Sequence, residues 1–406
     1  MDAGSVSASD SGTASESGSA SDSGSEMLGR GPSRRRYRVG VSLLWRSLLT
    51  MALLGCDGAP PEARSEPTPR AAAIAEPRAI SDAAAFALVP TGEGALLVWG
   101  AQRGVRALPL GPLGEPAGAE VVLSDEARAI TEIDASASGR RVAVAWIRGD
   151  GGDAEVEATY SLDGGRSFAA PDRLGPTVRG STGRLDLAAH EDGSLVLYHR
   201  LPEGPCVASG GTCARFTRTG IGGDPSGGMR GTEPLEVQNP CEPLVSGALW
   251  HDGTWYHAVC HADPEPSTLV YAIRPAISYA APIDLSSGCR PLGIAPLDTG
   301  VAVMTRCAGR TTATQLDAMG RPLARFDPAE PSVACAAGRP SITLSERARL
   351  RLDGAREDLE ALLPDAIAPA GARAVWTGEA LIVAAHGDGH VTLRRSRCLG
   401  ERLARE

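Results

Sequence analysis

The 406-residue sequence contains no lysine and a single asparagine, Asn239, so all 40 of its basic residues are arginine. The codons of lysine and asparagine are AT-rich, and a GC-rich genome explains both shortages without selected phosphate chemistry. Two catalytic motifs are also missing, the Gly-x-Ser-x-Gly nucleophile elbow and the phosphate-binding loop of the Walker type. No cysteine pair has Cys-x-x-Cys spacing and no histidines have zinc-finger spacing, which argues against a structural zinc site.

Acidic residues outnumber basic residues in the chain that follows Gly55. Up to Gly55 there are five acidic residues and six arginines, which leaves 44 acidic against 34 basic residues after it, a net charge of about −10 (34 − 44). Nucleic acids and anionic lipids bind to clustered positive charge. The composition therefore predicts a soluble acidic surface and no nucleic-acid partner.

An apolar run of nine residues, Ser47 to Gly55, follows an arginine-rich stretch. It is too short to span a bilayer of roughly 30 Å but has the length of a signal-peptide core. Its end, Leu53-Leu54-Gly55-Cys56, resembles the lipobox of bacterial lipoproteins, in which the cysteine is diacylated and becomes the new N-terminus. Leu54 departs from the Ala, Ser or Thr that the family prefers. An ordinary secretory signal with an incidental cysteine and a twin-arginine signal are the alternatives.

These features divide the chain into four segments. Residues 1–33 form a low-complexity leader, rich in Ser, Ala, Gly, Asp and Glu up to Glu26, whose composition predicts disorder; translation starting at Met27 would remove most of it. Residues 34–55 are the expected signal peptide, Cys56 is the expected lipid attachment, and 56–80 is a Pro- and Ala-rich tether. Residues 81–406 are the expected folded domain. The predicted location is a bacterial cell envelope, on a membrane facing the periplasm or the cell surface.

The remaining cysteines agree with export, because their even number is typical of a disulfide framework. They are Cys206, Cys213, Cys241, Cys260, Cys289, Cys307, Cys335 and Cys398. Two units share the pattern Cys-x-Pro-Leu and a second cysteine at a nearly equal distance along the chain, which predicts the pairs Cys241–Cys260 and Cys289–Cys307 on adjacent antiparallel strands. Cys206–Cys213 would close a small loop, and Cys335–Cys398 would tie the last repeat together.

A repeat of turns and strands covers the expected domain. Glycine turns precede short apolar, β-prone segments at Gly94, Gly139, Gly193, Gly253, Gly300 and Gly378, and only the last interval is clearly longer than the others. A four-stranded propeller blade needs roughly 40–50 residues, which is close to the usual interval between these turns. The period therefore predicts an all-β, six-bladed β-propeller, and a seven-bladed one is the alternative because the last interval has room for an irregular hairpin near Asp353.

A second landmark recurs in phase with these turns. Residues 110–116 (LGPLGEP) match residues 316–322 (LDAMGRP). Gly114 follows the turn at Gly94 at the same distance at which Gly320 follows the turn at Gly300. The match predicts the turn between the outer two strands of a blade.

The segment Ser161-Leu-Asp163-Gly-Gly165-Arg-Ser-Phe168 is the most specific motif. It resembles the Asp box, or BNR repeat, of sialidase-like propellers. In that family the box is structural: Asp163 would accept hydrogen bonds from its own turn, Gly165 would permit a positive φ, and Phe168 would insert as an anchor. The resemblance implies a sialidase-like fold rather than catalysis.

No catalytic residue is predicted. The only Tyr-Arg pair, Tyr37-Arg38, lies in the export signal, so the arginine motif of sialidases has no counterpart in the domain. Two histidine pairs, His257/His261 and His386/His390, could each meet a metal, but strand ends and a hairpin turn explain them, and no metal or cofactor is predicted. The sequence thus predicts an exported, lipid-anchored, non-catalytic propeller that binds a glycan or protein; the alternative is a diverged carbohydrate-active hydrolase.

Overall fold

The computed structural model is all-β, and every pairing between its described strands is antiparallel. It describes residues 79–405, apart from short loop segments and the longer stretches 178–184, 206–211, 222–234, 274–282 and 352–371. Contacts divide the chain between Arg70 and Ala71, and all described residues belong to the second unit. The predicted leader, signal peptide, Cys56, Cys206 and tether up to residue 78 lie outside the described residues. Among those described, no helix has the length and hydropathy of a membrane span.

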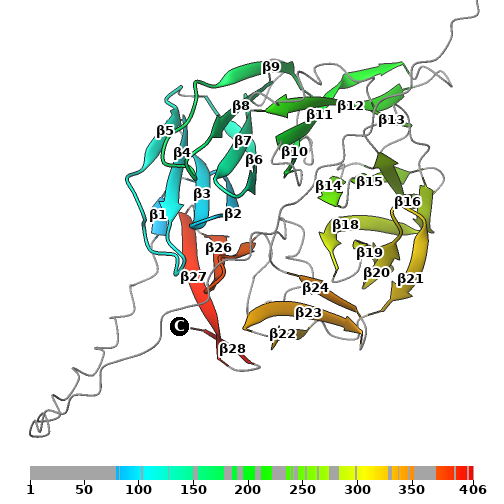
Figure 1. Ribbon diagram of the computed structural model, residues 1–406. Coiled ribbons are helices and arrows are strands. Elements are labelled where there is room, and N and C mark those ends of the chain that lie inside the picture. Colours follow the sequence, from blue (N-terminus) through cyan, green and yellow to red (C-terminus); the bar gives the residue numbers. More distant parts are fainter. Residues whose placement is uncertain are drawn as a thin grey trace, which may run out of the picture. The chain divides into compact units, whose positions relative to one another are not determined.

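The strands form seven sheets, which we call blades 1 to 7 and which can be followed along the chain in Figure 1. Blade 1 comprises β2 (Ala85–Thr91), β3 (Gly94–Ala101), β4 (Gly104–Leu110) and β5 (Val121–Ser124). Blade 2 comprises β6 (Ile130–Ser138), β7 (Arg141–Arg148), β8 (Glu155–Ser161) and β9 (Asp172–Pro176). Blade 3 comprises β10 (Leu185–Ala189), β11 (Leu195–Pro205), β12 (Thr212–Ile221) and β13 (Leu235–Gln238). Blade 4 comprises β14 (Ser246–His251), β15 (Thr254–Ala262), β16 (Pro266–Ile273) and β17 (Ile283–Ser287). Blade 5 comprises β18 (Cys289–Pro296), β19 (Val301–Cys307), β20 (Arg310–Leu316) and β21 (Pro322–Phe326). Blade 6 comprises β22 (Ser332–Ala336), β23 (Arg339–Ser345) and β24 (Ala348–Arg351); blade 7 comprises β25 (Arg373–Trp376), β26 (Leu381–Gly387) and β27 (His390–Leu399), with β1 (Ala79–Ser81) and β28 (Arg402–Arg405).

The blades are arranged as a propeller. The first strands touch in series from β2 through β6, β10 and β14 to β18, and β25 of the last blade touches β2. The core is a set of apolar layers between neighbouring blades, and one such layer joins Val98 of blade 1 to Trp146 of blade 2. Strands buried on both faces, such as β7, explain the continuous apolar runs of the sequence. The predicted all-β propeller is confirmed, and its described sheets number seven, the count that the sequence left as the alternative to six.

Blade 6 is the part that the repeat did not reveal. Its last strand β24 contacts β18, and its first strand β22 contacts β28, so the chain passes through this blade in the opposite sense to its neighbours. It occupies the long interval between Gly300 and Gly378, at 332–351, before the hairpin expected near Asp353. In this blade, whose described strands run in the reversed order, the turn after the first strand does not fall where the glycine repeat of the other blades would place it. The glycine turns in the sequence therefore indicated six blades and not seven.

The first described strand closes the propeller. Residues 79–81 of β1 pair with residues 390–392 of β27, beside the place where β28 pairs with residues 396–399. Ile80 is buried in the apolar layer between blades 7 and 1. Ala79 and Ile80, the last two residues of the predicted tether, are thus part of the sheet of blade 7, and both ends of the described chain complete the outer edge of that blade.

Turns between the third and fourth strands hold neighbouring blades together. The predicted match is confirmed, since Gly114 and Gly320 have positive φ angles of 80° and 78° in the β4–β5 and β20–β21 turns. A Cβ atom on Gly320 would lie 2.7 Å from the Cβ of Ala272 in the preceding blade, so only glycine fits this approach. Tyr256 of blade 4 donates its hydroxyl hydrogen to the carbonyl of Asp317 in the same turn, at 3.1 Å.

Three disulfides are present in the described residues: Cys241–Cys260, Cys289–Cys307 and Cys335–Cys398. The pairs Cys241–Cys260 and Cys289–Cys307 are those predicted from the repeated pattern. Cys289–Cys307 links the first two strands of blade 5, whereas Cys241 lies five residues before β14 and is joined to Cys260 in β15 of blade 4. The third joins β22 of blade 6 to β27 of blade 7, so it ties two blades and not one repeat. Cys213 is also disulfide-bonded, and its predicted partner Cys206 lies outside the described residues.

Candidate functional site

The Ser161–Phe168 turn lies between β8 and β9 and is held by Asp163. The carboxylate accepts hydrogen bonds from the amides of Arg166 (3.0 Å) and Ser167 (2.9 Å) and from the hydroxyls of Ser167 (2.6 Å) and Ser161 (2.8 Å). Burial alone would raise the pKa of Asp163, but these hydrogen bonds outweigh it and lower the pKa to about 2. Phe168 packs against the layer between blades 1 and 2. Both carboxylate oxygens of Asp163 are engaged within the turn, and the turn therefore has a structural role.

A buried arginine lies at the other end of the same blade. In the β7–β8 hairpin Val142 is opposite Ser161, whereas Arg148 is opposite Glu155, so Arg148 lies at the end of the blade away from the Asp163 turn. The Arg148 side chain is 1% exposed. A buried guanidinium requires paired charges around it, and the sequence supplies three acidic residues on neighbouring segments.

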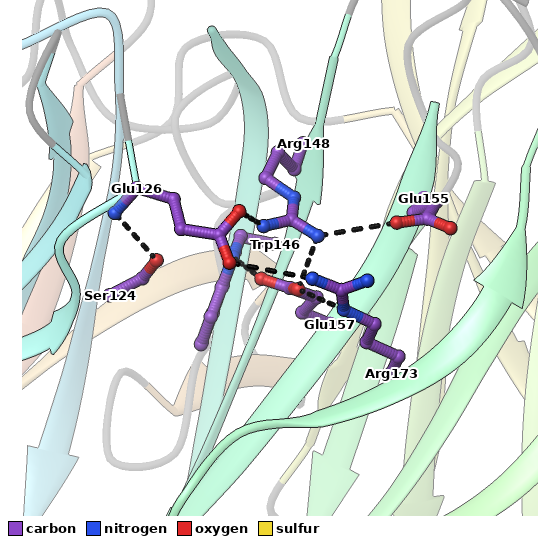
Figure 2. Close-up of polar contacts among 7 residues, drawn as sticks. All are labelled: Ser124, Glu126, Trp146, Arg148, Glu155, Glu157 and Arg173. Atoms are coloured by element: carbon purple, nitrogen blue, oxygen red, sulfur yellow. Dashed lines mark hydrogen bonds and ion pairs between the residues drawn. The ribbon is translucent and has the colours of Figure 1, made fainter. Parts of the chain in front are cut away.

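Figure 2 shows this group, which we call the Arg148 network. Arg148 Nη2 lies 2.8 Å from Glu157 Oε1 and 3.2 Å from Glu155 Oε2, and Nη1 contacts Glu126 Oε2. Arg173 Nε lies 3.4 Å from Glu157 Oε1, and its Nη2 lies 3.4 Å from Glu126 Oε1. Three carboxylates and two guanidiniums, drawn from β7, β8, β9 and the segment after β5, thus form one cluster.

The cluster has a buried base and an exposed rim. Trp146 Nε1 donates a hydrogen bond of 2.9 Å to Glu157 Oε2, and both side chains are buried. Both oxygens of Glu157 are therefore engaged. The side chains of Glu126, Glu155 and Arg173 are 46%, 36% and 61% exposed, so they present two carboxylates and one guanidinium to solvent.

Acidic side chains on the inner strands are also engaged. Glu132 accepts a hydrogen bond of 3.0 Å from the amide of Leu185, and Asp134 accepts one from the amide of Leu187, so β6 carboxylates pair with the inner edge of β10. Asp186 Oδ2 lies 3.1 Å from Nε2 of the buried His257 in blade 4. These contacts join the first strands of blades 2 and 3, and they join β10 of blade 3 to the second strand, β15, of blade 4.

His199 on β11 is buried in a different way. Strand alternation places it on the same face as Leu185 and Leu197, which belong to the apolar layer between blades 2 and 3. Among the described residues neither ring nitrogen has a hydrogen-bond partner. Burial lowers the pKa of His199 to about 4, because the charged imidazolium has no compensating partner there.

Most of the described charged side chains inside the blades are held in polar pairs. Glycoside hydrolysis requires two carboxyl groups about 5–9 Å apart that can reach the substrate. Within the described ranges the buried carboxylates are held by guanidiniums, backbone amides or His257, and no group of three or more His, Cys, Asp or Glu could hold a metal. The rim of the Arg148 network is the exposed array of donors and acceptors that this end of blade 2 offers a ligand.

One histidine of each pair considered in the sequence has a contact with another blade. His257 contacts Asp186, and His386 Nε2 lies 2.7 Å from the carbonyl of Ala83 while its ring stacks on Phe86. Both histidines are explained by contacts between blades. The Arg148 network was not predicted, although Trp146-x-Arg148 and Glu155-x-Glu157 alternate on two facing strands and are the signal that could have indicated it.

Comparisons with known proteins show a distant likeness in structure alone. No family model and no curated protein matches the sequence. An Aleuria aurantia lectin mutant in complex with α-methyl-L-fucoside has 10% identity and a TM-score of 0.40, covering 81% of this chain and 94% of the lectin. Trypanosoma rangeli sialidase in complex with the inhibitor DANA has 10% identity and a TM-score of 0.37, and the match covers 71% of this chain and 56% of the sialidase. A Bacillus subtilis arabinanase has 12% identity and a TM-score of 0.29, and the match covers 60% of this chain and 98% of the arabinanase. These values assign no activity to this chain.

Proposed function

We propose that this protein is a non-catalytic, lipid-anchored propeller that binds a glycan at the rim of the Arg148 network. The observation that carries the proposal is the saturation of Glu157 by Trp146, Arg148 and Arg173 beneath an exposed rim of unlike charges. A buried carboxylate whose two oxygens are both held by neighbouring donors is poorly placed to act on a glycosidic bond. The structural role of the Asp163 turn, which we interpret as an Asp box, supports the same conclusion.

The rim suits a polyhydroxylated ligand. Glu126 and Glu155 accept hydrogen bonds, Arg173 donates them, and neighbouring sugar hydroxyls need both kinds of partner. The ion pairs with Arg148 already restrict the side chains of Glu126 and Glu155, so these side chains lose less conformational freedom when a ligand binds. The alternative, a diverged hydrolase, requires one of these carboxylates to act on the sugar.

A glycan-binding assay with the purified chain tests the proposal. We expect binding to one class of glycan, with affinity reduced about tenfold in Glu155→Gln and Arg173→Gln, the loss expected for one charged hydrogen bond of about 1.4 kcal/mol. Glu93→Gln is the matched control, because Glu93 pairs with Arg166 at the opposite end of the blades. Binding to a protein with no glycan bound, or equal losses in the control, would contradict the proposal, and release of reducing sugar would favour the hydrolase.

Membrane attachment is a separate part of the proposal and rests on the lipobox-like sequence before Cys56. We expect Cys56→Ala to move the protein from the membrane to the soluble fraction with an unchanged melting temperature, because Cys56 precedes the folded domain. Intact mass of the wild-type protein provides the check. A soluble wild-type chain without an acyl group would show that the anchor does not exist.

A further inference from the structure

The disulfide between Cys289 and Cys307 has polar surroundings. Cys289 is buried, whereas Cys307 is partly exposed at the end of β19. Thr305 Oγ1 and Thr312 Oγ1 lie 3.7 and 3.8 Å from Cys307 Sγ, and Arg325 Nη2 lies 3.6 Å from the same sulfur. Two hydroxyls and one guanidinium therefore converge on one sulfur atom.

This end of blade 5 is also rich in positive charge. Arg290 and Arg306 are the next cross-strand pair after the disulfide, and Arg310 is the β20 partner of Cys307. All three are exposed. The described acidic contact is Asp327, whose Oδ1 lies 3.9 Å from Arg325 Nε. Positive potential of this kind attracts anionic thiolates and stabilises a thiolate that forms beside it.

The other two described disulfides have less reactive surroundings. Cys241 and Cys260 are 2% and 0% exposed, and Cys260 faces Thr268 across the sheet. Cys335 is buried, and Cys398 packs against the apolar layer that includes Ile342. Within the described contacts, neither pair has a sulfur atom hydrogen-bonded to a guanidinium.

We propose that Cys289–Cys307 is a thiol–disulfide exchange site for a dithiol reductant, and that it is reduced before the other two described disulfides. The proposal is independent of the glycan-binding function. A thiolate of the reductant attacks the partly exposed Cys307 at Sγ, the S–S bond breaks, and Cys289 leaves as a thiolate that takes a proton from the second thiol of the reductant. The carbonyl of Ser287, 3.5 Å from Cys289 Sγ, is placed to accept the hydrogen of the resulting thiol.

The second step uses the donors around Cys307. The remaining thiolate of the reductant attacks its own sulfur in the mixed disulfide, forms the oxidised reductant and expels Cys307 as a thiolate. Thr305, Thr312 and Arg325 surround this leaving group. Two electrons pass from the dithiol to the protein disulfide. A better stabilised leaving thiolate departs faster in this second step, and the guanidinium of Arg325 attracts the anionic reductant to Cys307 in the first step, so both steps are favoured at this bond.

Timed reduction of the folded protein with limiting dithiothreitol, followed by alkylation and peptide mass mapping, tests the order. Cleavage after arginine releases Cys307 on the short peptide 307–310, because Arg306 and Arg310 flank it. We expect Cys289 and Cys307 to be alkylated about ten times faster than the cysteines of the other two bonds. Equal rates, or earlier reduction of Cys241–Cys260, would overturn the proposal.

Two arginine variants separate a local effect from general charge. Arg325→Gln should slow reduction of this bond several-fold, because it removes the guanidinium at the sulfur. Arg306→Gln removes an equal charge one residue from Cys307, on the opposite face of the strand; it lowers the positive potential but does not contact the sulfur, so it should slow reduction less than Arg325→Gln does. If both variants slow reduction equally, or neither does, Arg325 has no specific role and the proposed exchange site is refuted. The order of reduction in the wild-type protein decides the proposal even where a variant fails to fold.

Discussion

Replacing Arg148 with alanine is expected to lower the free energy of unfolding by about 3–5 kcal/mol, the cost typical of breaking a buried ion pair. The variant leaves the buried Glu157 carboxylate with Trp146 Nε1 and the exposed Arg173 as its partners. It also releases Glu126 and Glu155 from their common cation. Chemical denaturation at neutral pH, monitored by tryptophan fluorescence, measures the change.

Arg173→Ala is the matched control, since Arg173 contacts the same Glu157 but is 61% exposed. Solvent screens its charge, so the loss should stay below about 1 kcal/mol. The double variant Arg148→Met/Glu157→Leu should be more stable than Arg148→Ala, because it removes both buried charges together. If Arg148→Ala and Arg173→Ala cost the same, Arg148 is not the structural centre of the network.

The second large effect expected is a loss of about 3 kcal/mol of stability as the pH falls from about 6.5 to about 4. Since the pKa of His199 is lowered from 6.5 to about 4 in the folded state, the unfolded chain binds a proton first in this window. Stability is therefore unaffected by His199 above pH 6.5 and is lost progressively below it. Asp163, whose lowered pKa is about 2, affects stability only below pH 4, so the two groups act in separate windows.

His199→Leu should remove this acid-dependent loss and raise stability at neutral pH by about 1 kcal/mol, because a side chain of similar size replaces two unsatisfied nitrogens among Leu185 and Leu197. Unfolding curves at pH 7, 5.5 and 4.5 provide the measurement. His386→Gln, at an exposed histidine, is the control and should keep the wild-type dependence. A variant at position 199 that retains the full loss would show that other groups cause it.

Much of the fold could be predicted because its repeat depends on local chemistry. Turns after the first strand of a blade require a positive φ, as at Gly139 (59°), Gly300 (93°) and Gly378 (101°), and such turns are visible in a single sequence. The cysteine pairs of blades 4 and 5 were predictable for the same reason, since each closes one hairpin. Blade 6 was missed because its chain direction reverses, and direction depends on contacts with β18 and β28 that no local pattern encodes.

The site was less predictable because its contacts depend on register and on distant segments. Arg148 meets Glu155 and Glu157 only after the β7–β8 hairpin fixes which residues are opposite. Glu126 reaches the cluster from another blade's end, and Asp186 meets His257 from a different blade. An alternating pattern shows which residues share one face of a strand, but it does not show which residues of other segments lie against that face. The rim of the Arg148 network therefore could not be predicted from the sequence and was identified only in the structure.

The pairing of β1 with β27 has a mechanical consequence. Only three residue pairs and the buried Ile80 hold the first described strand in place, and the chain that leads to Cys56 continues directly from it. If Cys56 carries the lipid anchor proposed above, tension on the chain from the membrane reaches this short strand before it reaches the other blades. A pull would first detach β1 from the outer edge of blade 7, while the contact of β25 with β2 and the disulfides of blades 4 and 5 remain in place.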